Sequence, residues 1–166
     1  MIKENTVCTS DLSNRVWQDP RYFIAFGFGS GLMPVAPGTF GTMAAIPLFL
    51  LMQDLSSSVY LGLLALFFVL GVWVSQVVTN DLGLEDYKGV VWDEVFGYLL
   101  TMWLAPAGLI WVFLGFALFR LFDIWKPFPI SWVDKKVHGG LGIMLDDLLA
   151  AVPAWLLLQM LAWSLQ

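Results

Sequence analysis

The sequence has few charged residues. Asp, Glu, Lys and Arg together make up 13% of the 166 residues, whereas soluble domains carry about 25%. Hydrophobic residues make up 59% of the chain, and the mean hydropathy is +0.78. The nine tryptophans are typical of proteins that contact membrane interfaces. The composition therefore predicts an integral membrane protein of the all-α class, a polytopic helical protein with re-entrant or interfacial segments.

Cysteine and histidine are nearly absent, with Cys8 and His138 the single examples. One cysteine cannot form an intrachain disulfide, and one cysteine far from one histidine makes a zinc site unfavourable. The sequence also lacks a G-x-S-x-G elbow and an Asp-x-Asp-x-Thr signature, which excludes two common routes to covalent hydrolysis. Its net charge of −5 indicates no binding of nucleic acid.

Long runs without charge determine the expected organisation. Residues 1–20 are polar and contain no apolar stretch of the signal-peptide kind, so we predict an N-terminal tail or short interfacial helix there, followed by a single membrane-embedded domain over 21–166. Apolar helices are expected at 42–52, 59–79 and 148–165. The run 95–119 contains Pro106 and Gly108 and is either one kinked helix or a hairpin. We favour the hairpin, because Lys and Arg on both sides of the run then share one face of the membrane.

A glycine- and proline-rich segment, GFGSGLMPVAPGTFGT at residues 27–42, precedes the first expected helix. Glycine permits unusual dihedral angles and proline interrupts helices, so we expect an irregular loop. Such a backbone survives at membrane depth when it is buried in protein or lines a wet cavity. The loop is either a structural turn or a phosphate cradle, and in the second case Gly29, Ser30 and Thr39 are the candidate substrate-binding residues.

Carboxylates gather at the ends of the apolar runs. Asp93–Glu94 and Asp146–Asp147 each stand directly before such a run. They are either helix caps or functional groups, since adjacent carboxylates at a membrane boundary are costly unless hydrated or paired. Carboxylate oxygens are the ligands that Mg²⁺ prefers, which makes Mg²⁺ the expected cofactor. The candidate ligands are Asp93, Glu94, Asp123, Asp146 and Asp147.

Basic residues accompany the acids in the segment 119–150. Arg120 and Lys126 bracket Asp123 at three-residue spacing, and we predict that both hold phosphate oxygens. Lys135 and Lys136 are more typical of a positively charged membrane surface. His138 is a candidate general acid or hydrogen-bond donor to phosphate. The alternative is a residue that lies at the membrane interface without a catalytic role. With no covalent route indicated, water activated by a metal is the simplest route to hydrolysis.

Four motifs together carry a resemblance that none of them carries alone. GFGSGLMPVAPGTFGT, VVWDEVFG, LFRLFDIWKPFPISWVD and VHGGLGIMLDD resemble, in order and spacing, the bacterial phosphatidylglycerophosphatase A family over about residues 20–152. The resemblance implies a Mg²⁺-dependent phosphatase of the inner membrane that converts phosphatidylglycerophosphate to phosphatidylglycerol and inorganic phosphate. It places the family's acidic positions on Asp93, Glu94, Asp123, Asp134, Asp146 and Asp147, and its basic and polar positions on Arg120, Lys126 and His138.

The leading hypothesis is a lipid phosphatase whose catalytic residues are Asp93, Glu94, Asp123, His138 and Asp146. Its expected partners are a phospholipid substrate and the inner (cytoplasmic) membrane, with the site on the cytoplasmic face. The alternative is a membrane transporter with an acidic ion-binding path, but its acids would be expected at helix midpoints rather than at helix ends. A structural membrane subunit would leave the clustered charge unexplained.

Overall fold

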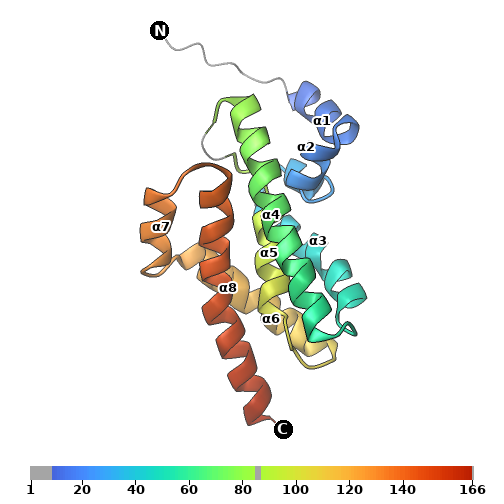
Figure 1. Cartoon of the computed structure of the whole chain (residues 1–166), viewed down its shortest axis with the longest axis vertical. Helices are drawn as coiled ribbons and strands as arrows, with labels where there is room; N and C mark the ends of the chain where they lie inside the picture. Colours follow the sequence, from blue (N-terminus) through green and yellow to red (C-terminus); the bar gives the residue numbers. More distant parts are fainter. Residues whose placement is uncertain (1–8, 85–86, 166) are drawn as a thin grey trace.

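The computed structural model describes residues 9–84 and 87–165, and within these ranges all regular structure is helical (Figure 1). Cys8 and the beginning of the polar tail lie outside the described residues. The elements in chain order are α1 (Thr9–Gln18), α2 (Pro20–Ala25), the 3₁₀ turn η1 (Ser30–Leu32), α3 (Pro37–Met52), α4 (Ser57–Leu82), α5 (Trp92–Thr101), α6 (Leu109–Trp125), α7 (Ile130–Lys136) and α8 (Gly139–Ser164).

Helices α4 and α8 are long and apolar enough to cross a membrane. Each has 26 residues, which corresponds to about 39 Å at 1.5 Å per residue. They run antiparallel in close contact, because Gly71 of α4 lies beside Met144 of α8 and Gly140 of α8 lies beside Val72. The membrane helix expected at 59–79 lies within α4, so that prediction is confirmed.

The run 95–119 is a hairpin rather than one kinked helix. Helix α5 ends at Thr101, residues 102–108 reverse the chain, and α6 begins at Leu109. Leu104 and Gly108 take positive φ angles of 61° and 126°, which a continuous helix does not allow. The reversal brings the end of α6 back beside the start of α5 (Figure 1).

Two helix boundaries differ from the expected ones. Helix α3 begins at Pro37, not at residue 42, and α8 begins at Gly139, not at residue 148. The glycines of α8 do not break the helix, because they permit close packing on α4: a Cβ on Gly140 would lie 2.1 Å from the carbonyl oxygen of Val72. Asp146 and Asp147 therefore lie inside α8 and not at its start, and the expectation that they open a helix was wrong.

Helices α1 and α2 cover the upper part of α4 (Figure 1). Leu12, Val16 and Phe26 pack there against Val74 and Val78. Between α2 and α3 the glycine-rich segment turns irregularly, with Phe28 and Gly29 at positive φ, and its last residues enter α3. The division of the chain at residue 20 stays a prediction. Helix α1 makes up about half of the predicted tail.

Candidate active site

A cavity of about 350 Å³ lies at one end of the bundle, where α5 and α3 begin, α6 ends and α8 passes. Most of the charged residues that lie near the helix ends in the sequence line this cavity. The ionisable residues that line it are Lys88, Asp93, Glu94, Arg120, Asp123, Lys126, Asp134, His138, Asp146 and Asp147. The hairpin of α5 and α6 returns Arg120 and Asp123 to the end where Asp93 and Glu94 begin α5, while α8 supplies the second acidic pair.

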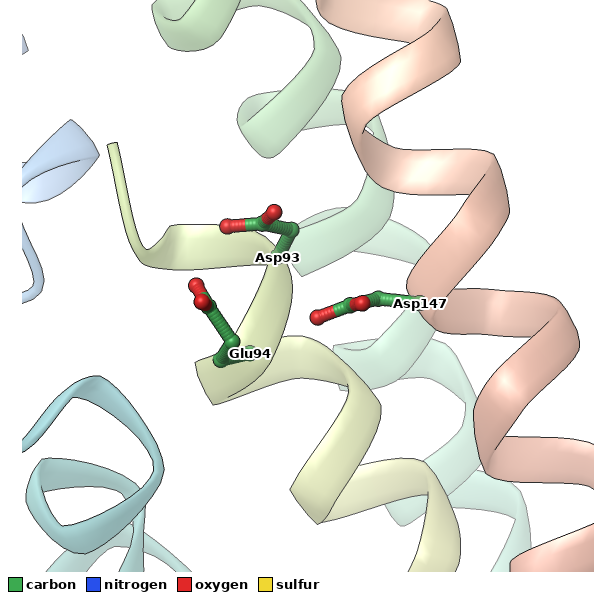
Figure 2. A group of neighbouring side chains, drawn as sticks. All are labelled: Asp93, Glu94 and Asp147. Atoms are coloured by element: carbon green, nitrogen blue, oxygen red, sulfur yellow. The ribbon is translucent and has the colours of Figure 1, made fainter. Parts of the chain in front are cut away.

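Three carboxylates meet in this cavity: Asp93 and Glu94 from the first turn of α5, and Asp147 from α8 (Figure 2). One oxygen of each lies within 4.8 Å of the others. Each of the three also has a buried oxygen without a hydrogen-bond partner. Buried anions are costly unless they are paired or bind a metal. This donor set therefore fits a hard divalent cation, which binds carboxylate oxygens.

The protonation of this cluster reflects its burial. Desolvation raises the pKa of Asp93 well above its usual value, and the charges of Glu94 and Asp147 raise it further. Burial also raises the pKa of Glu94, to about 7, although the Arg120 guanidinium opposes the shift. A cation bound between these groups would favour their charged forms.

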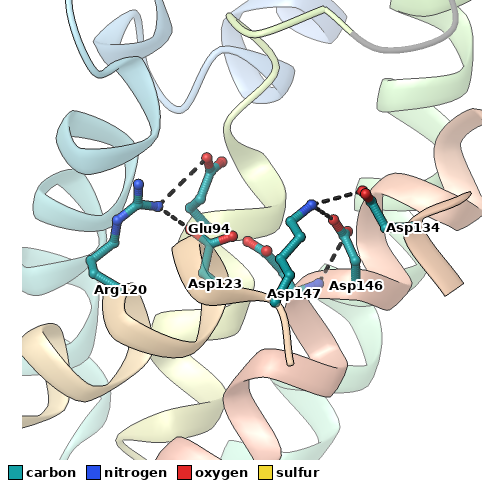
Figure 3. A network of polar contacts seen from close by, with 7 residues as sticks. Glu94, Arg120, Asp123, Asp134, Asp146 and Asp147 are labelled. Atoms are coloured by element: carbon teal, nitrogen blue, oxygen red, sulfur yellow. Dashed lines mark hydrogen bonds and ion pairs between the residues drawn. The ribbon is translucent and has the colours of Figure 1, made fainter. Parts of the chain in front are cut away.

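Arg120 links the cluster to Asp123 (Figure 3). Its guanidinium makes an ion pair with Asp123 three residues along α6, and one terminal nitrogen lies 3.8 Å from Glu94 Oε1. The Nε of Arg120 is buried and has no hydrogen-bond partner. Gly38 of α3 gives these groups room, since a Cβ there would lie 2.1 Å from Glu94 Oε1. Arg120 thus has a donor left for a further acceptor.

Lys126 forms a second ion-pair group. Its Nζ lies 2.7 Å from Asp134 Oδ1 and 2.5 Å from Asp146 Oδ2. Lys126 ends α6 in the left-handed conformation, with φ of 44°, which is uncommon outside glycine. Burial lowers the pKa of Lys126, but the two ion pairs outweigh this effect and raise it. Lys126 therefore carries its charge inside the cavity at neutral pH.

The sequence-predicted residues divide into two sets. All the predicted acids, Arg120, Lys126 and His138 line the cavity, whereas Gly29, Ser30 and Thr39 do not. Gly29 lies against the Trp17 ring, and the Ser30 hydroxyl donates to the Gly27 carbonyl at 2.7 Å. The predicted role of these three residues in substrate binding stays a prediction.

The sequence analysis did not assign several lining residues to the site, and two of them affect its charge and geometry: Lys88 and Gly38. Lys88 stands five positions before Asp93 in a polar loop, and the short distance along the chain was the available signal. Gly38 follows Pro37 in the glycine-rich segment, but its proximity to Glu94 depends on the packing of α3 against α5. No sequence pattern shows this proximity.

Comparison with known proteins points to one family. A family model described as phosphatidylglycerophosphatase A matches residues 23–162. The chain is 44% identical to the Escherichia coli K12 protein named phosphatidylglycerophosphatase A over 135 residues, which cover 81% of this chain and 78% of that protein. It is also 44% identical to the protein of the same name from Haemophilus influenzae over 138 residues, 82% of this chain and 85% of that protein.

A third relative, from Bacteroides thetaiotaomicron, is 35% identical over 148 residues and carries a provisional name as a phosphatidylinositol-3-phosphatase. This match covers 84% of the chain and 92% of that protein. No solved structure matches the chain. The names of all three relatives describe phosphatases that act on phospholipid headgroups.

Proposed function

Because this chain belongs to the phosphatidylglycerophosphatase A family, we propose that it hydrolyses the terminal phosphate of phosphatidylglycerophosphate in a Mg²⁺-dependent reaction. The observation that carries the proposal is the cluster of Asp93, Glu94 and Asp147 beside two partly buried cationic side chains, Arg120 and Lys126. A phosphate monoester has oxygens for both kinds of group. The products are phosphatidylglycerol and inorganic phosphate, and one water molecule is consumed.

We assign the cation to Asp93, Glu94 and Asp147, whose unpartnered buried oxygens fit a hard ion. When bound, Mg²⁺ would supply charge to neutralise the carboxylates and Lewis-acid assistance to hydrolysis. Asp123 and Asp146 are already paired with Arg120 and Lys126. We assign to these two carboxylates the role of holding the Arg120 and Lys126 side chains in place.

Arg120 and Lys126 are the residues that we assign to the transferred phosphate. Arg120 keeps a buried donor without a partner, and a guanidinium suits phosphate through paired N–H groups. Lys126 would exchange one of its two carboxylate partners for a phosphate oxygen. Lys88 lines the same cavity and adds a third positive charge, so it is a candidate contact for the phosphodiester closer to the lipid.

Direct attack of water, rather than attack by a hydroxyl or thiol side chain, is supported by what lines the cavity. No Ser, Thr, Cys or Tyr is found among the described lining residues. Attack of water on phosphorus breaks the bond to the glycerol oxygen, and that oxygen takes a proton as it leaves. We assign this proton to His138, at the beginning of α8 in the cavity wall. A carboxylate of the cavity would accept the proton from water.

The distribution of charge supports an enzyme rather than a transporter. It also supports a cytoplasmic orientation of the cavity. The turns at the end opposite the cavity, residues 53–56 and 102–108, contain no Lys or Arg, whereas Lys88, Arg120 and Lys126 line the cavity, and positive charge keeps its end of a membrane protein in the cytoplasm. The clustered acids also lie toward that end of α8 and at the first turn of α5. A transport path would require polar groups along the bundle, and the alternative is less well supported for that reason.

The experiment that tests the proposal is phosphate release from phosphatidylglycerophosphate in detergent micelles. Activity should disappear after chelation of divalent ions and return with Mg²⁺. Full activity after exhaustive chelation would contradict the metal assignment, and no phosphate release with added Mg²⁺ would contradict the substrate.

A second experiment separates the two routes of hydrolysis. With a chiral phosphorothioate substrate in isotopic water, a single direct attack inverts the configuration at phosphorus. Retention of configuration, or a phosphorylated residue trapped by acid, would contradict direct attack while leaving the phosphatase assignment intact.

A further inference from the structure

Three exposed aromatic side chains surround the segment from which Lys126 enters the cavity. Trp125, Phe128 and Trp132 are 69%, 82% and 56% exposed, and we call them the aromatic rim. They alternate along the chain with Lys126 and Asp134, both of which line the cavity. Ile130, which is 2% exposed, anchors the same segment in the core. One short stretch therefore presents charge to the cavity and aromatic rings to its surroundings.

We propose that the aromatic rim binds the glycerol backbone and upper acyl chains of the lipid, so that the substrate enters the cavity sideways from the membrane leaflet. The inference rests on the proposed function and adds to it a binding surface for the part of the lipid that does not react. The occupant is one phospholipid molecule, with its phosphate monoester in the cavity and its chains against the rim.

Continuity with the cavity is the first argument for this occupant. Lys126 Nζ is held inside by Asp134 and Asp146, while its neighbours Trp125 and Phe128 point outward. A ligand that reaches Lys126 with one end thus meets the rim with its next atoms. For a phospholipid, the atoms after the headgroup are the glycerol esters and acyl chains, which suit aromatic rings at a membrane interface.

Charge complementarity is the second argument. Lys135 and Lys136 close α7 beside the rim and are exposed. Neither of them lines the cavity, so they have no assigned contact with the reacting phosphate. Lysines next to exposed aromatic residues are typical of segments that lie on anionic lipid. Helix α7 lies beside the beginning of α8, at the same end of the molecule as the cavity (Figure 1).

Exposed apolar side chains elsewhere on this protein face the lipid for a different reason. Trp163, which is 84% exposed, lies in the last turn of α8 at the opposite end from the cavity. It matches Phe128 in exposure but has no connection to the cavity. Substitution of Trp163 therefore measures the effect of losing a general contact with the membrane. Any larger effect of substituting Phe128 is attributed to contact with the substrate.

The kinetic test compares Phe128→Ser and Trp132→Ser with Trp163→Ser. Each is assayed on long-chain phosphatidylglycerophosphate in mixed micelles and on a short-chain, monomeric analogue. For the rim variants, loss of an aromatic contact that the bound lipid would cover predicts a fall in kcat/KM of about tenfold or more on the long-chain lipid, through KM. On the short-chain analogue the rim variants should lose less, because fewer acyl carbons reach the rim, and Trp163→Ser should match the wild type. Thermal unfolding checks that each variant is folded.

The proposal is overturned if the rim variants lose activity equally on both substrates, if they lose none, or if Trp163→Ser loses as much on the long-chain lipid. A measurement that needs no turnover accompanies it. Photocrosslinking from Phe128→p-benzoylphenylalanine to a long-chain phosphonate analogue should be suppressed by excess unlabelled analogue, whereas crosslinking from the same replacement at Trp163 should not.

The two proposals fail in different ways. If the wild type releases no phosphate from either substrate, the proposed function is wrong. The photocrosslinking experiment with excess unlabelled analogue then tests lipid binding at the rim by itself. Crosslinking at Phe128 that excess analogue does not suppress would overturn the rim even in an active enzyme.

Discussion

The two ends of the helical bundle differ in the kind of polar side chain that they bury. At the far end, neutral side chains donate to backbone carbonyls: Tyr60 Oη to Leu99 O at 2.7 Å, and Trp155 Nε1 and Gln159 Nε2 to Trp103 O at 2.8 and 3.0 Å. At the cavity end, charged groups contact one another, and the cluster of Asp93, Glu94 and Asp147 keeps buried oxygens without partners.

We infer that this difference separates groups that stabilise the fold from groups with a proposed role in binding and catalysis. A hydrogen bond to a backbone carbonyl is complete without any other molecule, and each contributes about 0.5–1.5 kcal/mol. Three carboxylates close together, each with a buried oxygen that lacks a partner, cost stability that a bound cation would restore. Proteins tolerate such local costs mainly at functional sites. The contrast predicts that changes at the cavity end affect turnover and that changes at the far end affect stability.

The largest effect is expected from removing a charge of the carboxylate cluster. Asp93→Asn and Asp147→Asn should each lower kcat by about 10²–10³, because each removes one oxygen anion assigned to the cation. Asp54→Asn is the matched control, since Asp54 is an exposed acid at the far end, in the turn after α3. Phosphate release at saturating substrate measures the effect. Near-normal turnover in both Asp93→Asn and Asp147→Asn would contradict the prediction that changes at the cavity end affect turnover.

A methyl group at Gly38 tests the geometry of the cavity without changing its charge. In Gly38→Ala the new Cβ would lie 2.1 Å from Glu94 Oε1, so the carboxylate must move. A displacement of about 1 Å in a catalytic group can cost about 10²-fold in rate, and we expect a loss of that order. Gly62→Ala on α4 is the control, because nothing lies within 4 Å of a Cβ there.

Gly62→Ala should keep full activity and gain slight stability, as expected for an alanine in a helix. Equal activity in the Gly38 and Gly62 variants would show that the position of Glu94 does not limit turnover. Steady-state kinetics and circular dichroism on both variants make the measurement.

The pH dependence of stability should differ with and without Mg²⁺. The pKa of Glu94 is raised from 4.5 to about 7 by burial, so protonated Glu94 contributes stability at low pH that is lost as pH rises through 7. Without divalent ions we expect Tm to fall by several degrees between pH 6 and pH 8. Mg²⁺ should oppose this fall, because it binds the charged carboxylates.

Glu94→Gln provides the control for this titration. The neutral amide cannot lose a proton, so the fall in Tm of the metal-free protein between pH 6 and pH 8 should become smaller. Thermal unfolding in detergent with chelator, at two pH values, gives the comparison. An unchanged fall in the variant would assign the titration to other groups.

The smallest effect is expected at the far end. Trp155→Phe removes the donor to Trp103 O but keeps a ring in the stacked pair with Trp103. Because Gln159 still donates to that carbonyl, the free energy of unfolding should fall by about 0.5–1 kcal/mol. Turnover should be unchanged. A fall in kcat in the folded Trp155→Phe variant would show that the two ends are coupled.

The sequence predicted the class of the fold and the composition of the site better than its detailed contacts. The charge deficit indicates a membrane protein, and the basic residues around the run 95–119 indicate the hairpin. The start of α8 was missed because Gly139 and Gly140 are typical helix breakers in isolation. Their backbone fits here against Gln76 of α4, whose side-chain oxygen accepts the N–H of Gly140 at 2.9 Å.

The division of the acids also could not be predicted. Asp146 and Asp147 are neighbours on one helix, where successive side chains point about 100° apart. Asp146 meets Lys126, and Asp147 meets Asp93 and Glu94. Which of the two faces which partner depends on the rotation of α8 about its axis, and that rotation is set by packing on α4 and α5. Local sequence carries no record of it.

The α5–α6 hairpin has a consequence for the order in which the protein is made. Helix α5 has 10 residues, which is about 15 Å and too short to cross a bilayer alone. Its stable placement therefore requires the neighbours that follow, and α8 is the last of them to leave the ribosome. Since α8 also carries Asp147, the step that completes the packing of the hairpin completes the carboxylate cluster. A nascent chain would therefore acquire its proposed metal ligands as a set only when its membrane helices have assembled.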